Sequence, residues 1–598
     1  MARIPFHELE IIPQRRNKLK KRYKRGNVGL DTETYMGKVK IIADSSGRCI
    51  EPKSDIELLR FLNYRQYRGK IGWFWNLRYD FDSVVKWLPL DIVRELFYTS
   101  RTDYEGFKIE YIKGKYFELS RDKHHTRFYD MANFLPMSLE TASQTYLKTG
   151  KFKDVDSKRL NTDKKYWEMN IEFIKKYCVR DAQLTKMLAD YFWGLVNTTT
   201  GLLPNKPYSQ GSYSQDYFLE KCFIPQVQNI PTEVLNYAYQ SYYGGRFELL
   251  QRGHFEKIYI YDIKSAYPAV MAEMPDFTRG SWVYTDELNP DYQHGFYQCQ
   301  VIAMNDVISP FMQKYWGLNC YCNGRFNCYL TGYEIDYINR YFPSSEINVY
   351  DGFYWVPEGK ELHPFAEEIE RLYTWKEQEK DENIKYVLKM TLNALSGKLI
   401  QTVGGHTGKL FNPLYAAECT ARTRLKLLEA ARLTGINNVV GFSTDAIHTT
   451  RSFNPIKTRD DALGDFIEDF RGEGLYILSD VYSAWNLDRE KNRFRGMYID
   501  MESLENKKKK TIRVKDMLTQ MGDQATVYRY DVVRPVHLGE VIKHTQRESI
   551  LNLNLFHTSE KRIDINGDKK RLWDPVSFVS AAEALETHHV SEPLVLGV

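Results

Sequence analysis

The sequence contains few cysteines and no long apolar run. An uninterrupted stretch of about 18 apolar residues, the length that a membrane-spanning helix needs, is missing. Residues 1–5 lack the apolar character of a secretory signal. Eight cysteines among 598 residues are too few for a disulfide scaffold. These absences argue against a membrane protein and a disulfide-rich secreted protein, so we expect a cytoplasmic protein without a membrane partner.

A cysteine pattern typical of structural zinc is also missing. Cys320, Cys322 and Cys328 form a C-x-C-x5-C cluster without paired C-x2-C spacing and without a histidine close by in the sequence. We therefore expect no structural metal there.

The chain has no strong excess of charge of either sign. Lys and Arg number 83 against 78 Asp and Glu, a net charge of +5. The distribution of charge along the chain, rather than the net charge, must therefore indicate which partners it binds. Residues 15–25 read RRNKLKKRYKR and residues 507–510 are all lysine. Such runs either bind a polyanion or form a solvated surface segment. A nucleic-acid partner is therefore one of two interpretations.

The length requires several domains, because one domain usually holds about 100 to 200 residues. Internal repeats are absent, and strand and helix signals alternate, which predicts a mixed α/β and α+β multidomain protein. Strands are predicted at 27–33 and 38–43 across a turn at Met36-Gly37, and a helix at 162–196. Turn formers at 198–210 mark a boundary.

A first set of acids is predicted to converge. Asp31 and Glu33 lie two apart on a strand and therefore share a face. Asp80 ends the run Asn76-Leu77-Arg78-Tyr79-Asp80, and Tyr177 and Asp181 lie one helical turn apart. Such carboxylates suit two Mg²⁺ ions that cleave a phosphodiester. The alternative is exposed surface charge.

A second set of acids follows. Asp262 ends the β-rich run at 258–261, and Asp445 is predicted in a turn between two short strands in Gly441-Phe442-Ser443-Thr444-Asp445. Between these acids, Lys385, Lys389 and Asn393 step by four along a predicted helix, as a triphosphate-binding stripe would. Alternatively the lysines pair with the acids at 377–382.

The order of these motifs resembles two known families. D-T-E, N-x-x-Y-D and Y-x-x-x-D resemble the motifs of DnaQ-like 3'-5' exonucleases, which are related to RNase H. D-x-x-S-x-Y-P, K-x-x-x-N-x-x-x-G and T-D resemble motifs A, B and C of family B DNA polymerases. Tyr242-Tyr243-Gly244-Gly245 resembles the Y-x-G-G motif, and the long link from Asp262 to Lys389 favours the protein-primed branch.

The resemblance implies an RNase H-like exonuclease domain followed by a right-hand polymerase with palm, fingers and thumb. The boundaries that follow are 1–26 for a basic arm, 27–197 for the exonuclease, 198–274 for the first part of the palm, 275–358 for an insertion like TPR1, 359–398 for the fingers, 399–515 for the second part of the palm, and 516–598 for the thumb and C-terminal region. The thumb is assigned by position alone.

The resemblance also implies residue roles. Asp262 and Asp445 would hold two Mg²⁺ ions in the polymerase, and Asp31, Glu33, Asp80 and Asp181 would hold two in the exonuclease, with Mn²⁺ as a substitute. Tyr177 would orient the attacking water. The nucleotide-binding residues would be Ser265, Tyr267, Lys385, Lys389 and Asn393. The DNA-binding residues would be Asn76, Tyr79, Ser138, Leu139, Tyr242, Gly244, Gly245, Arg495 and Tyr498.

The sequence departs from the family pattern at several positions. Ser443 replaces the first acid of motif C, Ala394 and Ser396 alter motif B, and Ala266 alters motif A. The K-x-Y motif is recognisable only as Arg495-Gly496-Met497-Tyr498. The link from 397 to 441 leaves only a hairpin tip at 401–409, so the second insertion, TPR2, is expected to be reduced or absent.

The resemblance predicts a monomeric proofreading DNA polymerase of a viral or plasmid-type genome. Its partners would be primer–template DNA, deoxynucleoside triphosphates, a terminal protein as primer, and a single-stranded DNA-binding protein or helicase. Priming by an ordinary 3'-hydroxyl end stays open. Two rival readings are an exonuclease with an inactive polymerase half and a noncatalytic DNA-binding replication factor.

Overall fold

The computed structural model describes residues 4–12, 26–152, 155–304, 306–315, 317–454, 462–479, 481–494, 513–522 and 525–597. The basic run at 15–25, the lysines at 507–510, and Arg495 and Tyr498 lie outside these residues, so their predicted roles stay predictions.

The first module is built on an eight-stranded sheet of order β3-β2-β1-β4-β8-β7-β6-β5. Its strands are β1 (Asn27–Tyr35), β2 (Lys38–Asp44), β3 (Cys49–Ile50), β4 (Ile71–Phe74), β5 (Arg101–Tyr104), β6 (Phe107–Ile112), β7 (Tyr116–Arg121) and β8 (His124–Asp130). Met36 and Gly37 both have positive φ, as a tight hairpin turn requires, so the predicted opening hairpin is present.

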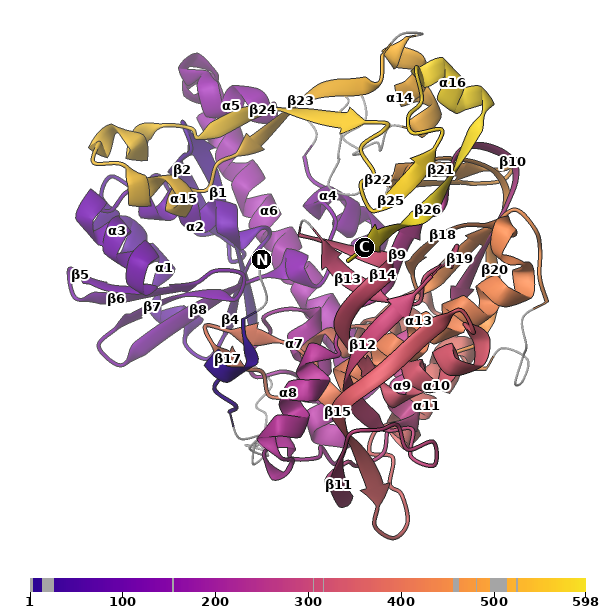
Figure 1. Cartoon of the computed structure of the whole chain (residues 1–598). Helices are drawn as coiled ribbons and strands as arrows, with labels where there is room; N and C mark the ends of the chain where they lie inside the picture. Colours follow the sequence, from indigo (N-terminus) through magenta and orange to yellow (C-terminus); the bar gives the residue numbers. More distant parts are fainter. Residues whose placement is uncertain are drawn as a thin grey trace.

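Helices cover this sheet, shown in indigo and purple in Figure 1. They are α1 (Asp55–Leu62), α2 (Leu77–Val85), α3 (Leu90–Thr99), α4 (Leu139–Ala142), α5 (Ser157–Thr162) and α6 (Lys164–Thr200). The helix predicted at 162–196 is α6. Its first turn is capped by Asp163, and it ends where Gly201 adopts a left-handed conformation.

Helix α6 packs directly against β1 because Gly29 has no side chain. A Cβ atom at Gly29 would lie only 2.0 Å from the carbonyl oxygen of Ala182. Since β1 carries Asp31 and Glu33, and α6 carries Tyr177 and Asp181, this close approach brings both halves of the first acid set together.

The second sheet has fourteen strands and joins the predicted palm to the predicted insertion. Its main path runs β11-β15-β12-β14-β26-β10-β19-β18-β9. The strands are β9 (Arg246–Leu249), β10 (Gln251–Ile263), β11 (Gly280–Thr285), β12 (Gly295–Ala303), β13 (Met312–Tyr315), β14 (Leu318–Thr331), β15 (Ser345–Pro357), β18 (Val439–Thr444), β19 (Ala446–Thr449), β20 (Phe466–Leu478), β21 (Val481–Trp485), β22 (Glu490–Phe494), β25 (Arg571–Asp574) and β26 (His588–Leu596).

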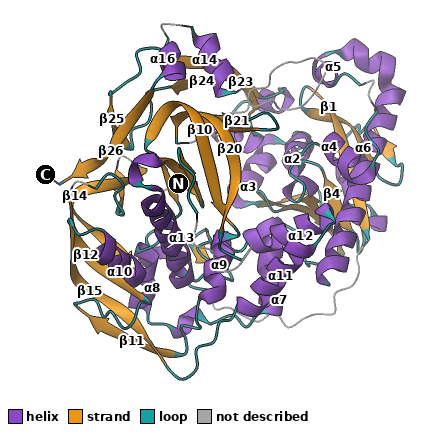
Figure 2. Ribbon diagram, turned by 90° about the vertical axis from the view of Figure 1, so that its right-hand side faces the viewer, coloured by secondary structure: helices purple, strands orange, loops and turns teal. Residues whose placement is uncertain are grey.

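Six of the seven helices of this half contribute to a core shared with the first module, and α10 packs in a separate core (Figure 2). The seven are α7 (Gln210–Lys221), α8 (Thr232–Gln240), α9 (Ala266–Glu273), α10 (Gly332–Tyr341), α11 (Ala366–Gln378), α12 (Glu382–Asn393) and α13 (Pro413–Thr434). The shared core contains Trp73 and Trp193 from the first module and Tyr213 and Leu388 from the second. The two modules are therefore joined by buried apolar contacts as well as by the chain.

The link from 397 to 441 contains a short hairpin and α13. The hairpin consists of β16 (Thr402–Val403) and β17 (His406–Thr407), at the position where the sequence predicts a hairpin tip.

Residues 516–598, predicted as the thumb and C-terminal region, contribute to three places. Helices α14 (Val514–Met521) and α16 (Ala581–Glu586) pack with β20 and β21 in one core. A ribbon of β23 (Val527–Pro535) and β24 (Phe556–Asp564) runs from there to the first module, where α15 (Leu538–Val541) docks (Figure 1). Strands β25 and β26 return to the large sheet.

None of the described helices combines the length and the apolar character needed to cross a bilayer.

Candidate active sites

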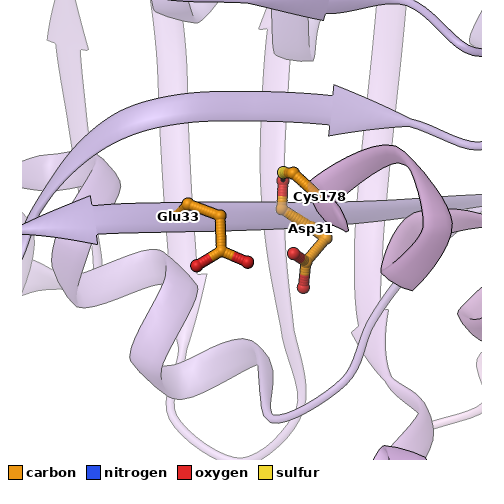
Figure 3. Close-up of side chains that lie close together, drawn as sticks. All are labelled: Asp31, Glu33 and Cys178. Atoms are coloured by element: carbon orange, nitrogen blue, oxygen red, sulfur yellow. Dashed lines mark hydrogen bonds between the residues drawn. The ribbon is translucent and has the colours of Figure 1, made fainter. Parts of the chain in front are cut away.

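The structure brings the first acid set together in the first module. Asp31 and Glu33 point to the same side of β1, and Cys178 approaches from α6 (Figure 3). Ligand atoms of these three residues lie within 4.8 Å of one another. Asp80, on α2, accepts a 2.6 Å hydrogen bond from the hydroxyl of Thr32, which lies between the two β1 acids.

Burial and mutual repulsion strongly perturb these acids. Burial is the main cause that raises the pKa of Glu33 to about 8, and the charge of Asp181 adds to it. Burial also raises the pKa of Asp80 to about 8. The pKa of Asp31 is raised well above its ordinary value by burial and then by Asp181. Such a cluster cannot stay ionised without cations nearby.

Lys151 supplies one cation that the sequence analysis missed. Its ammonium group forms an ion pair with Asp181 and lies 4.8 Å from the centre of the Tyr177 ring. Its charge opposes the rise in the pKa of Asp31, Glu33 and Asp181. In the sequence Lys151 is one of several lysines in a predicted loop, which is too common a feature to single it out.

The carboxylate oxygens of this cluster that have no hydrogen-bond partner among the described residues are suited to bind divalent metal ions. One carboxylate oxygen of Asp31 and one of Asp181 are buried and lack a hydrogen-bond partner among the described residues. An unpaired buried carboxylate oxygen is costly unless a cation binds it. Oxygen ligands of this kind are those that Mg²⁺ prefers. The cluster of Asp31, Glu33, Asp80 and Asp181 therefore fits the predicted pair of ions.

The predicted DNA-contacting residues of this module differ in their positions and in their contacts. Asn76 has a left-handed backbone, and its amide donates to Asp130. The Tyr79 hydroxyl is hydrogen-bonded to Thr34 at 2.7 Å. Ser138 caps α4, and Leu139 is 6% exposed within the core. Tyr79 thus lies near Glu33 and Asp80, Asn76 contacts Asp130, and Ser138 and Leu139 also have structural roles.

The second acid set is assembled by strand pairing. Asp262 in β10 lies opposite Ala446 in β19, and the amide of Ile263 donates to the carbonyl oxygen of Asp445 at 3.0 Å. Asp445 lies in the tight turn between β18 and β19, where Thr444 has a positive φ. The predicted presentation of Asp445 by two short strands is confirmed.

Cations from two elements act on these acids. The pKa of Asp262 is raised to about 6 by burial and by Asp445, while Lys491 and Lys389 lower it. The pKa of Asp445 is raised by burial, and Arg493 opposes the rise. Lys389 was predicted from its helix stripe. Lys491 and Arg493, in β22, were missed because nothing in the sequence pairs that strand with the acids.

The motif at 242–245 contacts the same site. A Cβ atom at Gly245 would lie 2.8 Å from the Tyr267 hydroxyl and 2.8 Å from a Thr444 methyl group, so a side chain has no room there. The carbonyl oxygen of Gly244 accepts a 2.5 Å hydrogen bond from Arg424 of α13. Asp445 and Tyr242 both add to the rise in the pKa of Tyr267, which places that phenol near the acids.

Helix α12 carries the predicted triphosphate stripe. Lys385 forms an ion pair with Glu382 at 2.9 Å, as the alternative reading anticipated. Lys389 is exposed, and Asn393 is the last residue of the helix. Ser265 precedes α9 with a positive φ, and Ser443 lies in β18 beside Asp445.

The structure also places the three clustered cysteines. Cys320, Cys322 and Cys328 are buried, and they do not gather with other metal-ligating groups among the described residues.

Part of the sequence matches a known protein family. A family model described as DNA polymerase type B, organellar and viral, matches residues 148–402. No curated protein has a matching sequence.

Solved structures give the fold. The chain is similar to the Phi29 DNA polymerase complexed with primer-template DNA and incoming nucleotide substrates, with a TM-score of 0.64 and 14% identity over 90% of this chain and 100% of that chain. It is also similar to the Phi29 DNA polymerase complexed with single-stranded DNA, with a TM-score of 0.58 and 16% identity over 79% and 92% of the two chains. The family match agrees with the predicted resemblance to family B DNA polymerases, and the similarity to the Phi29 structures confirms the predicted fold class.

Proposed function

We propose that this protein is a template-directed DNA polymerase with a 3'-5' proofreading exonuclease. The observation that carries the proposal is the assembly of two separate acid sets on one chain. One lies where β1, α2 and α6 meet, and the other lies where β10, β18 and β19 meet.

In the polymerase site, Asp262 and Asp445 are the residues to hold Mg²⁺. When bound, the ions would activate the primer hydroxyl and stabilise the leaving pyrophosphate. Lys389, supported by Lys385, neutralises the triphosphate, and Asn393 lies near the incoming base. Tyr267 and Ser265 contact the nucleotide, and Tyr242, Gly244 and Gly245 contact the template.

The retained acid at 445 supports an active polymerase despite Ser443. Lys491 and Arg493 bring further positive charge to the two acids. Both therefore favour the ionised carboxylates that bind metal.

In the exonuclease site, Asp31, Glu33, Asp80 and Asp181 are the residues to hold Mg²⁺. Tyr177 orients the attacking water, and Lys151 compensates the negative charge of the cluster. Asn76 and Tyr79 grip the frayed primer end. We also propose Ser138 and Leu139 as contacts to the single strand, with Leu139 acting through its buried packing.

The partners follow from this function. They are primer–template DNA, deoxynucleoside triphosphates and a terminal protein that supplies the priming hydroxyl. The Phi29 structures contain primer-template DNA and nucleotides, which supports the first two partners. The sheet formed by β11, β12, β14 and β15 supports the third, because it is an insertion between Asp262 and Lys389 of the size expected for TPR1. The genome copied is of the viral or plasmid type.

The experiment that tests both activities is extension of a 5'-labelled primer with Mg²⁺, with and without deoxynucleoside triphosphates. Asp445→Ala should abolish extension and keep degradation, and Asp31→Ala should abolish degradation and keep extension. Degradation without extension by the intact chain would support the rival reading of a nuclease with an inactive palm.

A further inference from the structure

Residues 537–555, which connect β23 to β24, dock on the nuclease module far from them in sequence. We call this segment the C-terminal clamp. Leu538, Ile542 and Leu551 are at most 7% exposed and belong to the same hydrophobic core as α2 and α3. Three buried apolar side chains contribute several kcal/mol, at about 1.5–3 kcal/mol each, so the contact is more than incidental.

Polar contacts fix the register of the clamp on one face of α2. Arg78 donates to Glu540 at 2.9 Å, and Asp82 accepts from the amide of Leu538 at 3.2 Å and is hydrogen-bonded to His537 at 3.1 Å. Arg78 and Asp82 are four residues apart and share a face of the helix. Asp80 lies between them in sequence and points the other way, into the acid cluster.

The clamp also holds the turn that follows the β1 acids. The ammonium group of Lys86 donates to the carbonyl oxygen of Leu553 at 2.9 Å. A Cβ atom at Gly37 would lie 2.8 Å from that ammonium group and 3.3 Å from the Cα of Asn554. The clamp therefore contacts both segments that carry Asp31, Glu33 and Asp80.

A third contact fixes the clamp to α3. Arg94 donates to the carbonyl oxygen of Ile542 and to the side chain of Gln546, at 3.3 and 2.6 Å. Gly539 packs so closely on Phe97 that a Cβ atom would lie 2.5 Å from its ring.

We propose that the C-terminal clamp is a positioning element for the nuclease site. It fixes α2 and the β1–β2 turn relative to each other, and so sets the spacing of the acids that would hold the metal ions. Because the ribbon connects the clamp to α14 and α16, the position of these helices is coupled to the nuclease site. The inference rests on the proposed exonuclease function.

The main test removes the clamp. Pro535 and Phe556 are directly opposite in the β23–β24 pairing, so residues 536–555 can be replaced by Asn-Gly, which closes a two-residue hairpin. Degradation of a 5'-labelled single strand should fall about tenfold at low Mg²⁺, the typical effect of losing a group that orients metal ligands. The Mg²⁺ concentration for half-maximal rate should rise, and primer extension by the same preparation should be kept.

A matched pair of point variants separates docking from loss of charge. Glu540 pairs with Arg78 of the nuclease module, whereas Glu560 pairs with Arg529 within the ribbon. Glu540→Ala should lower degradation about twofold, as expected for an exposed ion pair, and Glu560→Ala should leave it unchanged. Trypsin should cut after Lys543 faster in Glu540→Ala than in Glu560→Ala.

A reversible engineered disulfide between the clamp and α3 tests whether the effect of clamp removal is only a general effect on folding. The Cβ position at Gly539 lies 3.2 Å from Phe97 Cγ, which is bonded to Phe97 Cβ, so Phe97→Cys with Gly539→Cys places two thiols within disulfide reach. The oxidised form should degrade faster than the reduced form. In an Asp262→Ala, Asp445→Ala background it should also bind Mn²⁺ more tightly by electron paramagnetic resonance. Each single-cysteine variant is the control.

The outcomes are distinguishable. If the intact chain degrades no DNA, the proposed function fails. If the intact chain degrades DNA, and clamp removal and stapling change neither the rate nor its Mg²⁺ dependence, the clamp has no positioning role.

Discussion

Lys151 determines how much negative charge the proposed nuclease site can hold. Burial and repulsion raise the pKa of Asp31, Glu33 and Asp181, and Lys151 is the lysine whose charge opposes this for all three. Without it the acids would hold protons where metal ions should bind.

We therefore expect Lys151→Met to lower exonuclease activity about 10- to 100-fold and to leave primer extension intact. Rates of single-strand degradation measure the effect. Lys175→Met is the control, because Lys175 pairs with Glu51 and Glu172 in the same module. Wild-type degradation by Lys151→Met would contradict the charge argument.

The raised pKa values predict how stability depends on pH. A carboxyl group whose pKa is higher in the folded state than in the unfolded state binds its proton more tightly when folded. Stability is therefore lost as pH rises from the ordinary pKa toward about 8, the value for Glu33 and Asp80. In EDTA, melting temperature should fall over this window. Glu33→Gln should flatten the fall, and Mg²⁺ should stabilise more at pH 8 than at pH 6.

The two proposed activities should also decline at different pH values as the solution becomes more acidic. Asp262 has a pKa of about 6, against about 8 for Glu33 and Asp80. Protons compete with Mg²⁺ for these carboxylates, so degradation should decline at a higher pH than extension when Mg²⁺ is limiting. Rates of both between pH 5.5 and 9 measure this, and raising Mg²⁺ should shift both limits toward lower pH.

At the scale of elements, the contact between β1 and α6 depends on Gly29. Gly29→Ala would force the strand and helix apart, because its Cβ atom would lie 2.0 Å from the carbonyl oxygen of Ala182. We expect a loss of about 1–3 kcal/mol in unfolding free energy and a drop in exonuclease activity. Gly26→Ala is the control, since the nearest atom there is 3.7 Å away. Chemical denaturation and degradation rates measure both; equal behaviour of the two variants would refute the close-packing argument.

The sequence predicted the strands, helix and turn that carry the acids better than it predicted the basic side chains that lie next to those acids. The strand at β1, the helix α6 and the turn at Asp445 follow from local periodicity and turn chemistry, which depend on nearby residues alone. Lys151, Lys491 and Arg493 were missed because their roles depend on long-range packing. The docking of residues 537–555 was missed for the same reason, since amphipathic short turns do not specify which surface they cover.

At the scale of the whole molecule, Arg571 connects several segments. It is 3% exposed and donates to Glu248 of β9 at 2.5 Å, to the carbonyl oxygen of Val307 in the insertion at 2.8 Å, and to Ser591 of β26. A buried cation shared in this way is costly to remove, because its acidic partner stays buried.

Arg571→Met should therefore destabilise the protein by about 3 kcal/mol, the lower end for a broken buried ion pair, and lower the melting temperature of the palm and the insertion together. Glu248 keeps Arg246 as a partner, which limits the loss. Calorimetry measures the change. A melting temperature equal to that of the native chain would refute the proposed linkage.

Strand β26 lies between β14 of the insertion and β10 of the palm, so residues 588–596 complete the centre of the large sheet. During translation, the nuclease sheet can form as soon as residues 27–200 have left the ribosome. The two parts of the large sheet, one with β10 and one with β14, can be joined only after β26 has been made. Until then residues 251–253 of β10 and 322–324 of β14 lack the strand that pairs with them and can pair with other chains instead. Nascent chains that still lack β26 should therefore be prone to aggregation, and slow translation should increase it.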